Sequence, residues 1–300
     1  CDCGELVTSL EMAGVSLSLC WLDAELEAFW SAAADSPAYR RGSLVPLAEL
    51  PPAAAATDLQ AAPETETALD VQRLSPEQRT LLACFAAVEA ELQGRVEELG
   101  ALDAVAGDGD HGLAMLRGSQ GAHASARRSL ARGCGSGELL IEAGEAWSDQ
   151  AGGTSGALWG GALLAAGSHL ALASALDGAQ QVVAAVEAAL QAVVSLGQAA
   201  PGDKTMLDAL EPFSRRLRQD VQAGLGLEPA LRQAAAACLE AARATAELLP
   251  VRGRARPHGS RSLGHPDPGA MSLAYAVLAA TQALMAANGG PTGGSSQPTP

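Results

Sequence analysis

The sequence predicts an all-α fold, and three observations support this. Alanine and leucine, both good helix formers, dominate a chain that is 48% hydrophobic and only 3% aromatic. Runs of β-branched residues are scarce, so we expect little sheet. From residue 75 onward, apolar residues recur at helical spacing between short loops that contain Gly, Pro or Asp. Short loops favour antiparallel neighbours, so these stretches predict an up-and-down arrangement.

The first helix of this region is expected to begin at Ser75. The sequence "SPEQ" offers a Ser N-cap, a Pro at the first helical position and a Gln at the third, which is the pattern of a capping box. Gly100 is expected to end the helix. Apolar residues follow the start at spacings of three and four: Leu81, Phe85, Val88, Leu92, Val96 and Leu99.

Seven further helices are expected, which makes eight in all. Their ranges are 112–131, 137–150, 155–174, 179–198, 204–221, 228–248 and 268–287. In an up-and-down arrangement, the loops after the first, third, fifth and seventh helices lie at the same end. These four loops hold the polar motifs of the chain: "DAVAGDGDHG", "GGTSG", "PGDKTM" and "GRARPHGSRSLGHPDPG". We therefore expect the four motifs to meet in space.

The chain divides into four parts by composition. Residues 1–43 hold an alternating apolar run, "GVSLSLCWL", that suits a strand, followed by a short helix, "DAELEAFW", with Asp23 as its N-cap. Residues 44–74 are rich in Pro and Ala without apolar periodicity and are typical of a linker. Residues 75–290 form the helical domain, and residues 291–300 have the composition of a disordered tail.

Composition also bounds the location and the partners. A net charge of −15 argues against nucleic acid and anionic membranes as partners. The six cysteines are scattered, which is typical of free thiols in a reducing cytoplasm. No signal peptide is expected, and the Cys start favours a truncated beginning. Residues 156–176 are uncharged over a membrane-spanning length, but their Gly, Ala and Ser content with His169 favours a buried helix.

Three aspartates, Asp103, Asp108 and Asp110, crowd one Gly-rich loop. Their charges repel unless a hard cation such as Mg²⁺ or Ca²⁺ holds them. A calcium EF-hand is excluded, because the sixth position from Asp103 is Asp108 rather than Gly, and the twelfth from Asp108 is Ser119 rather than Glu. Mg²⁺ prefers a few carboxylates plus phosphates, which indicates a nucleotide site. The alternative is a solvated acidic turn.

The other polar loops offer further candidate groups. "GGTSG" can cradle phosphate with backbone N–H groups at a helix N-terminus. "GQAAPGDKT" is not a Walker A loop, because Asp203 interrupts its Gly-Lys pair and no strand precedes it. Asp203 is instead expected to be a helix N-cap, with Thr205 and Met206 lining a nucleotide pocket, although a Met is more often a core residue.

The last loop combines Arg254 with Asp267 thirteen residues later, and it holds four arginines after Pro250. Arginines can stabilise a transferring phosphoryl group. The alternative is an exposed arginine that pairs with a surface carboxylate. His111 and His265 are expected to be hydrogen-bonding loop residues rather than nucleophiles.

Five motifs together, "LDAVAGDGDHG", "GGTSGALWGGAL", "APGDKTMLDAL", "GRA" and "GHPDPGA", resemble the nucleotide-binding L domain of dihydroxyacetone (glycerone) kinases. The start of the chain is similar to the last strand and helix of the substrate-binding K domain of these enzymes. The Pro/Ala-rich linker resembles that of the single-chain, ATP-dependent members. The resemblance implies an eight-helix antiparallel barrel of the DhaL type, with the nucleotide at one end.

The resemblance also implies roles for individual residues. Asp103, Asp108 and Asp110 match the trio that binds two Mg²⁺ ions bridging the phosphates of ATP or ADP, and Arg254 matches the catalytic arginine near these phosphates. The matching nucleotide contacts are His111, Gly112, Leu113, Ala114, Thr154, Ser155, Gly197, Thr205, Met206, Asp267, Pro268 and Gly269. Two departures are Leu113 and Ala114, where a polar residue is common, and "GRARPHGSR" in place of "GRASYLGER".

The activity implied is ATP-dependent phosphorylation of dihydroxyacetone or glyceraldehyde. The family holds dihydroxyacetone covalently on a K-domain histidine, so this chain is expected to need a K domain and to be inactive alone. A homodimer would form through the full-length parent. Two alternatives stay open: an FAD-AMP lyase that forms cyclic FMN, as in animal relatives, and a non-catalytic, ADP-loaded module that binds proteins.

Overall fold

The computed structural model describes residues 21–35, 40–41, 69–172, 178–251 and 259–288. The chain divides into two compact units, residues 1–66 and residues 67–300. Each unit is described by itself.

The first unit contains one helix and one strand pair in its described part. Helix α1 (Ala24–Ser31) begins at Asp23, whose carboxylate accepts hydrogen bonds from the N–H groups of Glu25 and Leu26 and confirms the expected N-cap. Strands β1 (Ala34–Asp35) and β2 (Arg40–Arg41) pair antiparallel. The expected strand "GVSLSLCWL" lies outside the described residues except for its last two, which have no regular structure.

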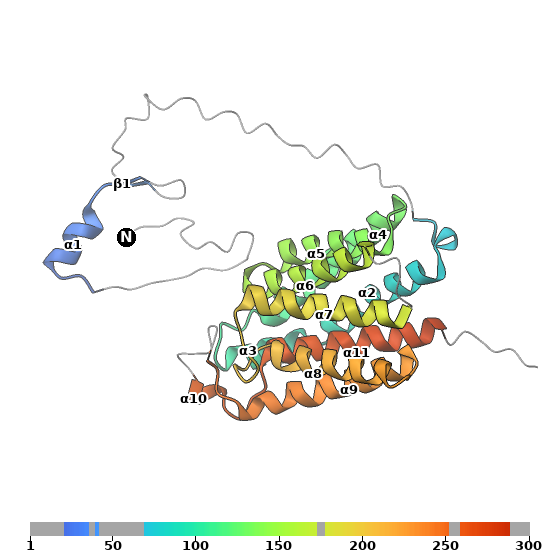
Figure 1. The fold of residues 1–300 in the computed structure, drawn as a ribbon. Helices are drawn as coiled ribbons and strands as arrows, with labels where there is room; N and C mark the ends of the chain where they lie inside the picture. Colours follow the sequence, from blue (N-terminus) through green and yellow to red (C-terminus); the bar gives the residue numbers. More distant parts are fainter. Residues whose placement is uncertain (1–20, 36–39, 42–68, 173–177, 252–258, 289–300) are drawn as a thin grey trace, which may run out of the picture. The chain divides into compact units, whose positions relative to one another are not determined.

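Long helices lie side by side in the second unit (Figure 1). Eight of them close into a ring through their contacts. They are α2 (Pro76–Gly94), α4 (His111–Ala131), α5 (Ser136–Ala151), α6 (Gly153–Leu172), α7 (Gly178–Gly197), α8 (Leu207–Gln222), α9 (Leu227–Ala244) and α11 (Pro268–Asn288). Each helix packs against the next in this order, and α11 packs back against α2. The expected all-α, eight-helix antiparallel barrel is therefore confirmed.

Four short elements lie between or beside these helices. They are η2 (Val71–Arg73), α3 (Val96–Ala104), η3 (Thr245–Glu247) and α10 (Gly259–Ser262). Leu74, at the end of the expected linker, is only 7% exposed and belongs to the core of the second unit. Two expected helices are shorter than their patterns suggested. Helix α8 begins at Leu207 rather than residue 204, and α9 ends at Ala244 because its last residues turn into η3.

The first expected helix is divided into α2 and α3. Its start is as predicted, since Ser75 and Gln78 form the capping box and Pro76 is the first helical residue. Its expected end at Gly100 is wrong. Arg95 leaves the helical conformation with φ −110° and ψ 5°, and α3 then continues to Ala104. Gly100 lies inside α3, where a Cβ atom would stand 3.1 Å from the carbonyl oxygen of Gly109. The glycine therefore permits a close approach of the aspartate loop.

An ionic cluster ties the α2–α3 junction to α11. Arg95 donates to Glu91 at 2.9 Å and to Glu98 at 2.8 Å, and its guanidinium group lies 4.3 Å from the ring centroid of Tyr275. The Tyr275 hydroxyl donates to Glu98. Since Tyr275 belongs to α11, these contacts hold α3 and the loop after it in place.

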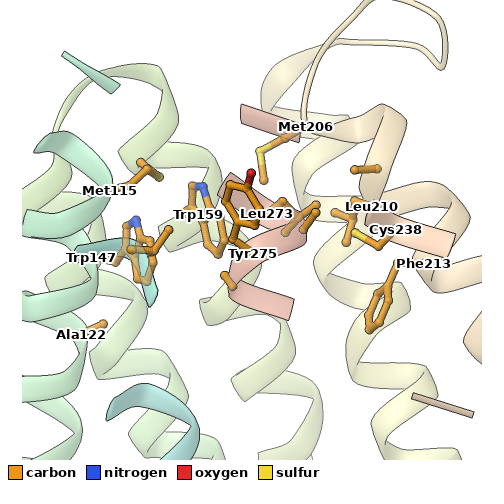
Figure 2. Packing of buried hydrophobic residues seen from close by; sticks show 14 of the residues in the cluster. Met115, Ala122, Trp147, Trp159, Met206, Leu210, Phe213, Cys238, Leu273 and Tyr275 are labelled. Atoms are coloured by element: carbon orange, nitrogen blue, oxygen red, sulfur yellow. The ribbon is translucent and has the colours of Figure 1, made fainter. Parts of the chain in front are cut away.

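The core combines a pair of stacked tryptophans with many small residues (Figure 2). The rings of Trp147 in α5 and Trp159 in α6 stack with centroids 4.6 Å apart and an interplanar angle of 11°. Beside them, a Cβ atom at Gly160 would lie 2.6 Å from the carbonyl oxygen of Gly144. The two helices can approach so closely because neither has a side chain at this point.

Two helices of the described part, α7 and α11, are long and apolar enough to cross a membrane by length and composition alone. This is weak evidence, because buried core helices pass the same test. Half of the α11 span is buried, and α11 packs against α2 and α9. The uncharged segment flagged in the sequence forms most of α6, which packs between α5 and α7.

Replacing Ser75 with Ala tests the capping box. We expect the free energy of unfolding to fall by about 1 kcal/mol, because the N–H of Gln78 loses its acceptor at the start of α2. Urea denaturation followed by circular dichroism measures the change. Ser195→Ala, at an exposed position in α7, is the control and should change stability by less than about 0.5 kcal/mol. Equal effects of the two changes would contradict the assigned cap.

Candidate nucleotide and metal site

The aspartate trio converges in the structure. One carboxylate oxygen from each of Asp103, Asp108 and Asp110 lies within 4.8 Å of the others. Asp103 lies in the last turn of α3, and the other two aspartates follow in the loop that leads to α4. This spacing would allow the three side chains to share a divalent cation with oxygen ligands, and their role as metal ligands stays a prediction. Three carboxylates this close repel one another strongly when no cation lies between them.

The loop conformation is set by Asp103 and two glycines. One oxygen of the Asp103 carboxylate accepts a hydrogen bond from the Gly109 N–H at 2.8 Å, and the Asp103 carbonyl accepts one from the Gly107 N–H at 2.6 Å. A Cβ atom at Gly107 would lie 2.4 Å from the other carboxylate oxygen of Asp103. Gly109 has φ +80°, which disfavours other residues. The glycines therefore leave the second oxygen of Asp103 accessible to a cation.

Helix α4 begins directly after the trio. Gly112 packs against α3 so closely that a Cβ atom would lie 2.1 Å from the carbonyl oxygen of Val96. His111 is buried, and its Nε2 atom lies 2.9 Å from the hydroxyl of Ser272 in α11. Burial lowers the pKa of His111, which favours the neutral ring. Leu113 is 50% exposed, while Ala114 is half-buried against the core.

The "GGTSG" motif forms the start of α6. Gly152 and Gly153 have φ values of +63° and +60°, so the chain turns sharply before the helix. Thr154 is exposed and Ser155 is half-buried in the first turn. The end of α7 is adjacent, because a Cβ atom at Gly197 would lie 3.3 Å from the Leu158 side chain. Thr154, Ser155 and Gly197 therefore belong to the same end of the barrel.

The turn between α7 and α8 differs from its expectation in one respect. Asp203 is not the N-cap of α8, because its carboxylate accepts from the Ala200 N–H, outside the helix. Asp208 fixes the turn instead, by accepting from the N–H groups of Gly202 and Thr205. The carboxylate of Asp208, in the first turn of α8, thus fixes the backbone of the loop that precedes this helix. Met206, just before α8, is 5% exposed and belongs to the core cluster in Figure 2.

Lys204 occupies the middle of this turn with φ +62°. A left-handed conformation at a residue other than Gly costs about 1–3 kcal/mol and persists only where the surroundings enforce it. The side chain is 5% exposed, and its ammonium group donates to Leu248 and Ser262. Burial lowers the pKa of Lys204.

The connection between α9 and α11 carries Asp267, Pro268 and Gly269. The Asp267 carboxylate accepts from the Ala270 N–H at 2.7 Å, as an N-cap residue does, and its own N–H donates to the Thr245 hydroxyl at 2.8 Å. His265 is exposed. Arg254 lies outside the described residues, so its expected role stays a prediction.

Hydrogen bonds and packing link several of the expected site residues to one another. His111 reaches Ser272, Ser272 donates to the Gly269 carbonyl, and Gly269 packs near Met206. Four participants were not expected from the sequence: Lys204, Asp208, Thr245 and Ser272. Lys204 had one signal, as the only lysine among nineteen basic residues. Ser272 is an isolated hydroxyl residue in an apolar helix, and no sequence signal marked it as part of the site.

Asp267 gives a test of pH dependence. Burial raises the pKa of its carboxyl group from 3.8 to about 7, so between these values the folded protein holds a proton that the unfolded chain has lost. Stability from this group is therefore lost as the pH rises from 4 to 7. Asp267→Asn should gain stability relative to the unmodified chain over this range and keep a constant difference above pH 7. Urea denaturation at pH 4 to 8 measures this, and a pH-independent difference would contradict it.

A second group of potential ligands lies where α4 ends and α5 begins. Cys134, Glu138 and Glu142 also bring one ligand atom each within 4.8 Å of the others. Glu142, however, is already engaged by Arg132 and by the Ser129 hydroxyl. A charge change in this cluster is a suitable control for the same change in the aspartate trio.

The family model of the DAK2 domain matches residues 105–282, which include most of the barrel and the loop that carries Asp108 and Asp110. The chain belongs to the DAK2 domain family. The match begins two residues after Asp103 and ends within α11, so in the sequence it covers three of the four polar loops in full and the first loop from Val105 onward.

DAK2 relatives with assigned activities include kinases of small sugars. The chain is 46% identical over 284 residues to L-erythrulose kinase of Pectobacterium atrosepticum, covering 95% of this chain and 47% of the relative. It is 33% identical to triokinase/FMN cyclase of Rattus norvegicus, covering 94% and 47%. It is also 33% identical to DhaL, the ADP-binding subunit of the PEP-dependent dihydroxyacetone kinase of Escherichia coli, covering 60% and 84%. The chain thus spans about half the length of the full kinases.

Among solved structures, the chain is similar to the dihydroxyacetone kinase of C. freundii in complex with AMP-PNP and Mg²⁺. The TM-score is 0.54 at 28% identity, with 67% of this chain and 33% of that chain covered. The resemblance to dihydroxyacetone kinases that the sequence motifs indicated is therefore confirmed.

Proposed function

We propose that this DAK2 domain binds Mg·ATP and supplies the phosphoryl donor for a kinase of short ketoses. The observation that supports this most is the convergence of Asp103, Asp108 and Asp110 at the loop end of the barrel, where a shared divalent cation would offset the repulsion between three like charges. Solved and curated relatives carry AMP-PNP with Mg²⁺ or are named for ADP binding, which supports the same ligands here.

In this proposal the aspartates would hold two Mg²⁺ ions, which would offset the charge of the nucleotide phosphates. The phosphates would lie over the starts of α4 and α6, whose free N–H groups favour anions. The α4 contacts would be His111 to Ala114, and the α6 contacts Thr154 and Ser155. The base and ribose would contact Gly197, the turn with Thr205 and Met206, and the segment 267–269. Arg254 would stabilise the transferring phosphoryl group.

The acceptor would be supplied by a K domain, as the resemblance to dihydroxyacetone kinases implies. The relatives with the higher identity are named for erythrulose, which is dihydroxyacetone extended by one CHOH group. The acceptor class is therefore a three- or four-carbon ketose, held covalently by a K-domain histidine as the resemblance implies. Location in the cytoplasm and pairing through a full-length parent belong to the same proposal.

A complementation assay tests the division of labour. The purified chain is mixed with ATP, Mg²⁺ and either dihydroxyacetone or erythrulose, with and without a separately expressed K domain, and ADP release is followed. We expect turnover only with the K domain, because positioning an acceptor contributes a large part of the rate enhancement of a kinase. Fast ketose phosphorylation by the chain alone would contradict the proposal.

The triokinase/FMN cyclase relatives, at 31–33% identity, favour FAD cleavage as a second candidate. The same metal site would then bind FAD and form cyclic FMN. Incubation with FAD and Mn²⁺, followed by chromatography, separates the two candidates. If ADP stays bound through dialysis and exchanges with neither ATP nor FAD, a nucleotide-loaded binding module would replace both.

A further inference from the structure

Lys204 is the only lysine of the chain, and it is buried in a turn at the proposed nucleotide-binding end. A buried ammonium group is unfavourable unless its N–H donors all have acceptors. The other eighteen residues of the Lys and Arg set are arginines, so Lys204 carries the only side-chain ammonium group of the sequence.

The acceptors of Lys204 come from two separate segments of the α9–α11 connection. Its Nζ atom donates to the Leu248 carbonyl at 3.1 Å, to the Ser262 carbonyl at 2.6 Å and to the Ser262 hydroxyl at 3.3 Å. Leu248 follows η3, and Ser262 ends α10. One compact cation thus satisfies acceptors that converge from different directions, which suits an ammonium group better than a planar guanidinium.

The backbone around Lys204 is held in its unusual conformation from both sides. The Asp208 carboxylate accepts from Gly202 before the lysine and from Thr205 after it. The Val251 N–H donates to the Asp203 carbonyl at 3.3 Å. The left-handed φ of +62° therefore directs the lysine side chain to its acceptors through contacts that do not depend on the side chain itself.

The segments that Lys204 joins lead directly to proposed nucleotide contacts. Thr205 and Met206 follow it in the chain. On the other side, the Gly264 N–H donates to the Ala246 carbonyl at 2.8 Å, and the Asp267 N–H donates to the Thr245 hydroxyl at 2.8 Å. Through its bonds to Leu248 and Ser262, the ammonium group thus joins the α7–α8 turn to the α9–α11 connection, and both segments carry proposed nucleotide contacts.

We propose that Lys204 is a positioning residue for nucleotide binding, whose ammonium group fixes the turn with Thr205 and Met206 against the connection that carries Asp267. This inference rests on the proposed nucleotide binding. Lys204 has no contact with the phosphates in this proposal. Its loss should weaken affinity through the geometry of two loops and leave the aspartate trio unchanged.

Calorimetric titration with Mg·ADP and amide hydrogen exchange test the proposal on the complete 300-residue chain. Lys204→Met keeps the apolar stem but removes the donors. We expect its Kd for Mg·ADP to rise about tenfold, or 1.4 kcal/mol, and exchange at the amides of Gly264 and Asp267 to accelerate at least about tenfold without nucleotide. The matched control is Arg215→Met, which removes one positive charge from α8, where Arg215 pairs with Glu211 at the surface. It should change Kd less than about twofold.

The outcomes separate the two proposals. If the unmodified chain binds no Mg·ADP, the proposed function fails and this inference fails with it. If the unmodified chain binds and folded Lys204→Met binds within twofold of it, the positioning role alone is overturned. If Lys204→Met does not fold, Lys204→Gln, which keeps two donors on a shorter stem, is judged by the same Kd and exchange criteria. Restored affinity in Lys204→Arg would also overturn the need for a compact ammonium group.

Discussion

Asp108→Asn is expected to weaken Mg·ADP binding by about 100-fold or more, since a charged ligand should matter at least as much as the outer-shell partners whose loss typically costs 10–100-fold. Asp108 is the best member of the trio to replace, because it is exposed and the loop depends on the hydrogen bonds of Asp103. Calorimetric titration in the presence of Mg²⁺ measures the change.

The same substitution has a second, opposite signature. Without Mg²⁺, Asp108→Asn should be more stable than the unmodified chain, because one of three mutually repelling charges is gone. With Mg²⁺, the order should reverse, because only the complete trio gains stability from the cation. Glu138→Gln, in the cluster with Cys134 and Glu142, makes the same charge change at a site without a proposed role. Unchanged affinity in Asp108→Asn, or equal effects of both substitutions, would refute the metal assignment.

Gly112→Ala is expected to lower the free energy of unfolding by about 3 kcal/mol, at the upper end of typical overpacking effects. A Cβ atom at Gly112 would lie 2.1 Å from the carbonyl oxygen of Val96 and 2.9 Å from the carbonyl carbon of the same residue. Both atoms are backbone, so α4 must move away from α3. Urea denaturation followed by circular dichroism measures the loss.

Gly94→Ala is the matched control for this change. No heavy atom lies within 4 Å of a Cβ at Gly94, and the residue ends α2. The alanine should be neutral or stabilise the protein by up to about 1 kcal/mol. Because α4 begins directly after Asp110, Gly112→Ala should also weaken Mg²⁺ binding, whereas Gly94→Ala should not. A stability loss in Gly112→Ala no larger than that of the control would contradict the tight α3–α4 contact.

The fold could be predicted because its signals are local. The Ser75 cap, the apolar spacing and the short loops each depend on a few neighbouring residues, and up-and-down connectivity then brings alternate loops together. The misassigned ends have local causes too. Gly100 was expected to end a helix, but it lies inside α3, where the absence of a side chain allows the close approach of the Gly109 carbonyl oxygen. Asp203 was expected to be the N-cap of α8, but Asp208 accepts the hydrogen bonds from the N–H groups of Gly202 and Thr205 in the turn before this helix.

The site could be predicted in part. The trio lies within eight residues, so its convergence needs little information about the fold. The partners that hold the loops against one another are remote in sequence. Ser272 lies 161 residues from His111, and Ser262 lies 58 residues from Lys204. No periodicity or spacing marks such pairs, because they depend on how the ring of helices closes.

The most direct measurement is anomalous diffraction from crystals of the chain grown with ADP and Mn²⁺, which substitutes for Mg²⁺ at oxygen-ligand sites. We expect manganese peaks within coordination distance of the carboxylate oxygens of Asp103, Asp108 and Asp110, at about the 2.1 Å of Mg²⁺–oxygen bonds, with the ADP phosphates completing the coordination. Bound ADP with no peak at the trio, or manganese found only at Cys134, Glu138 and Glu142, would contradict it.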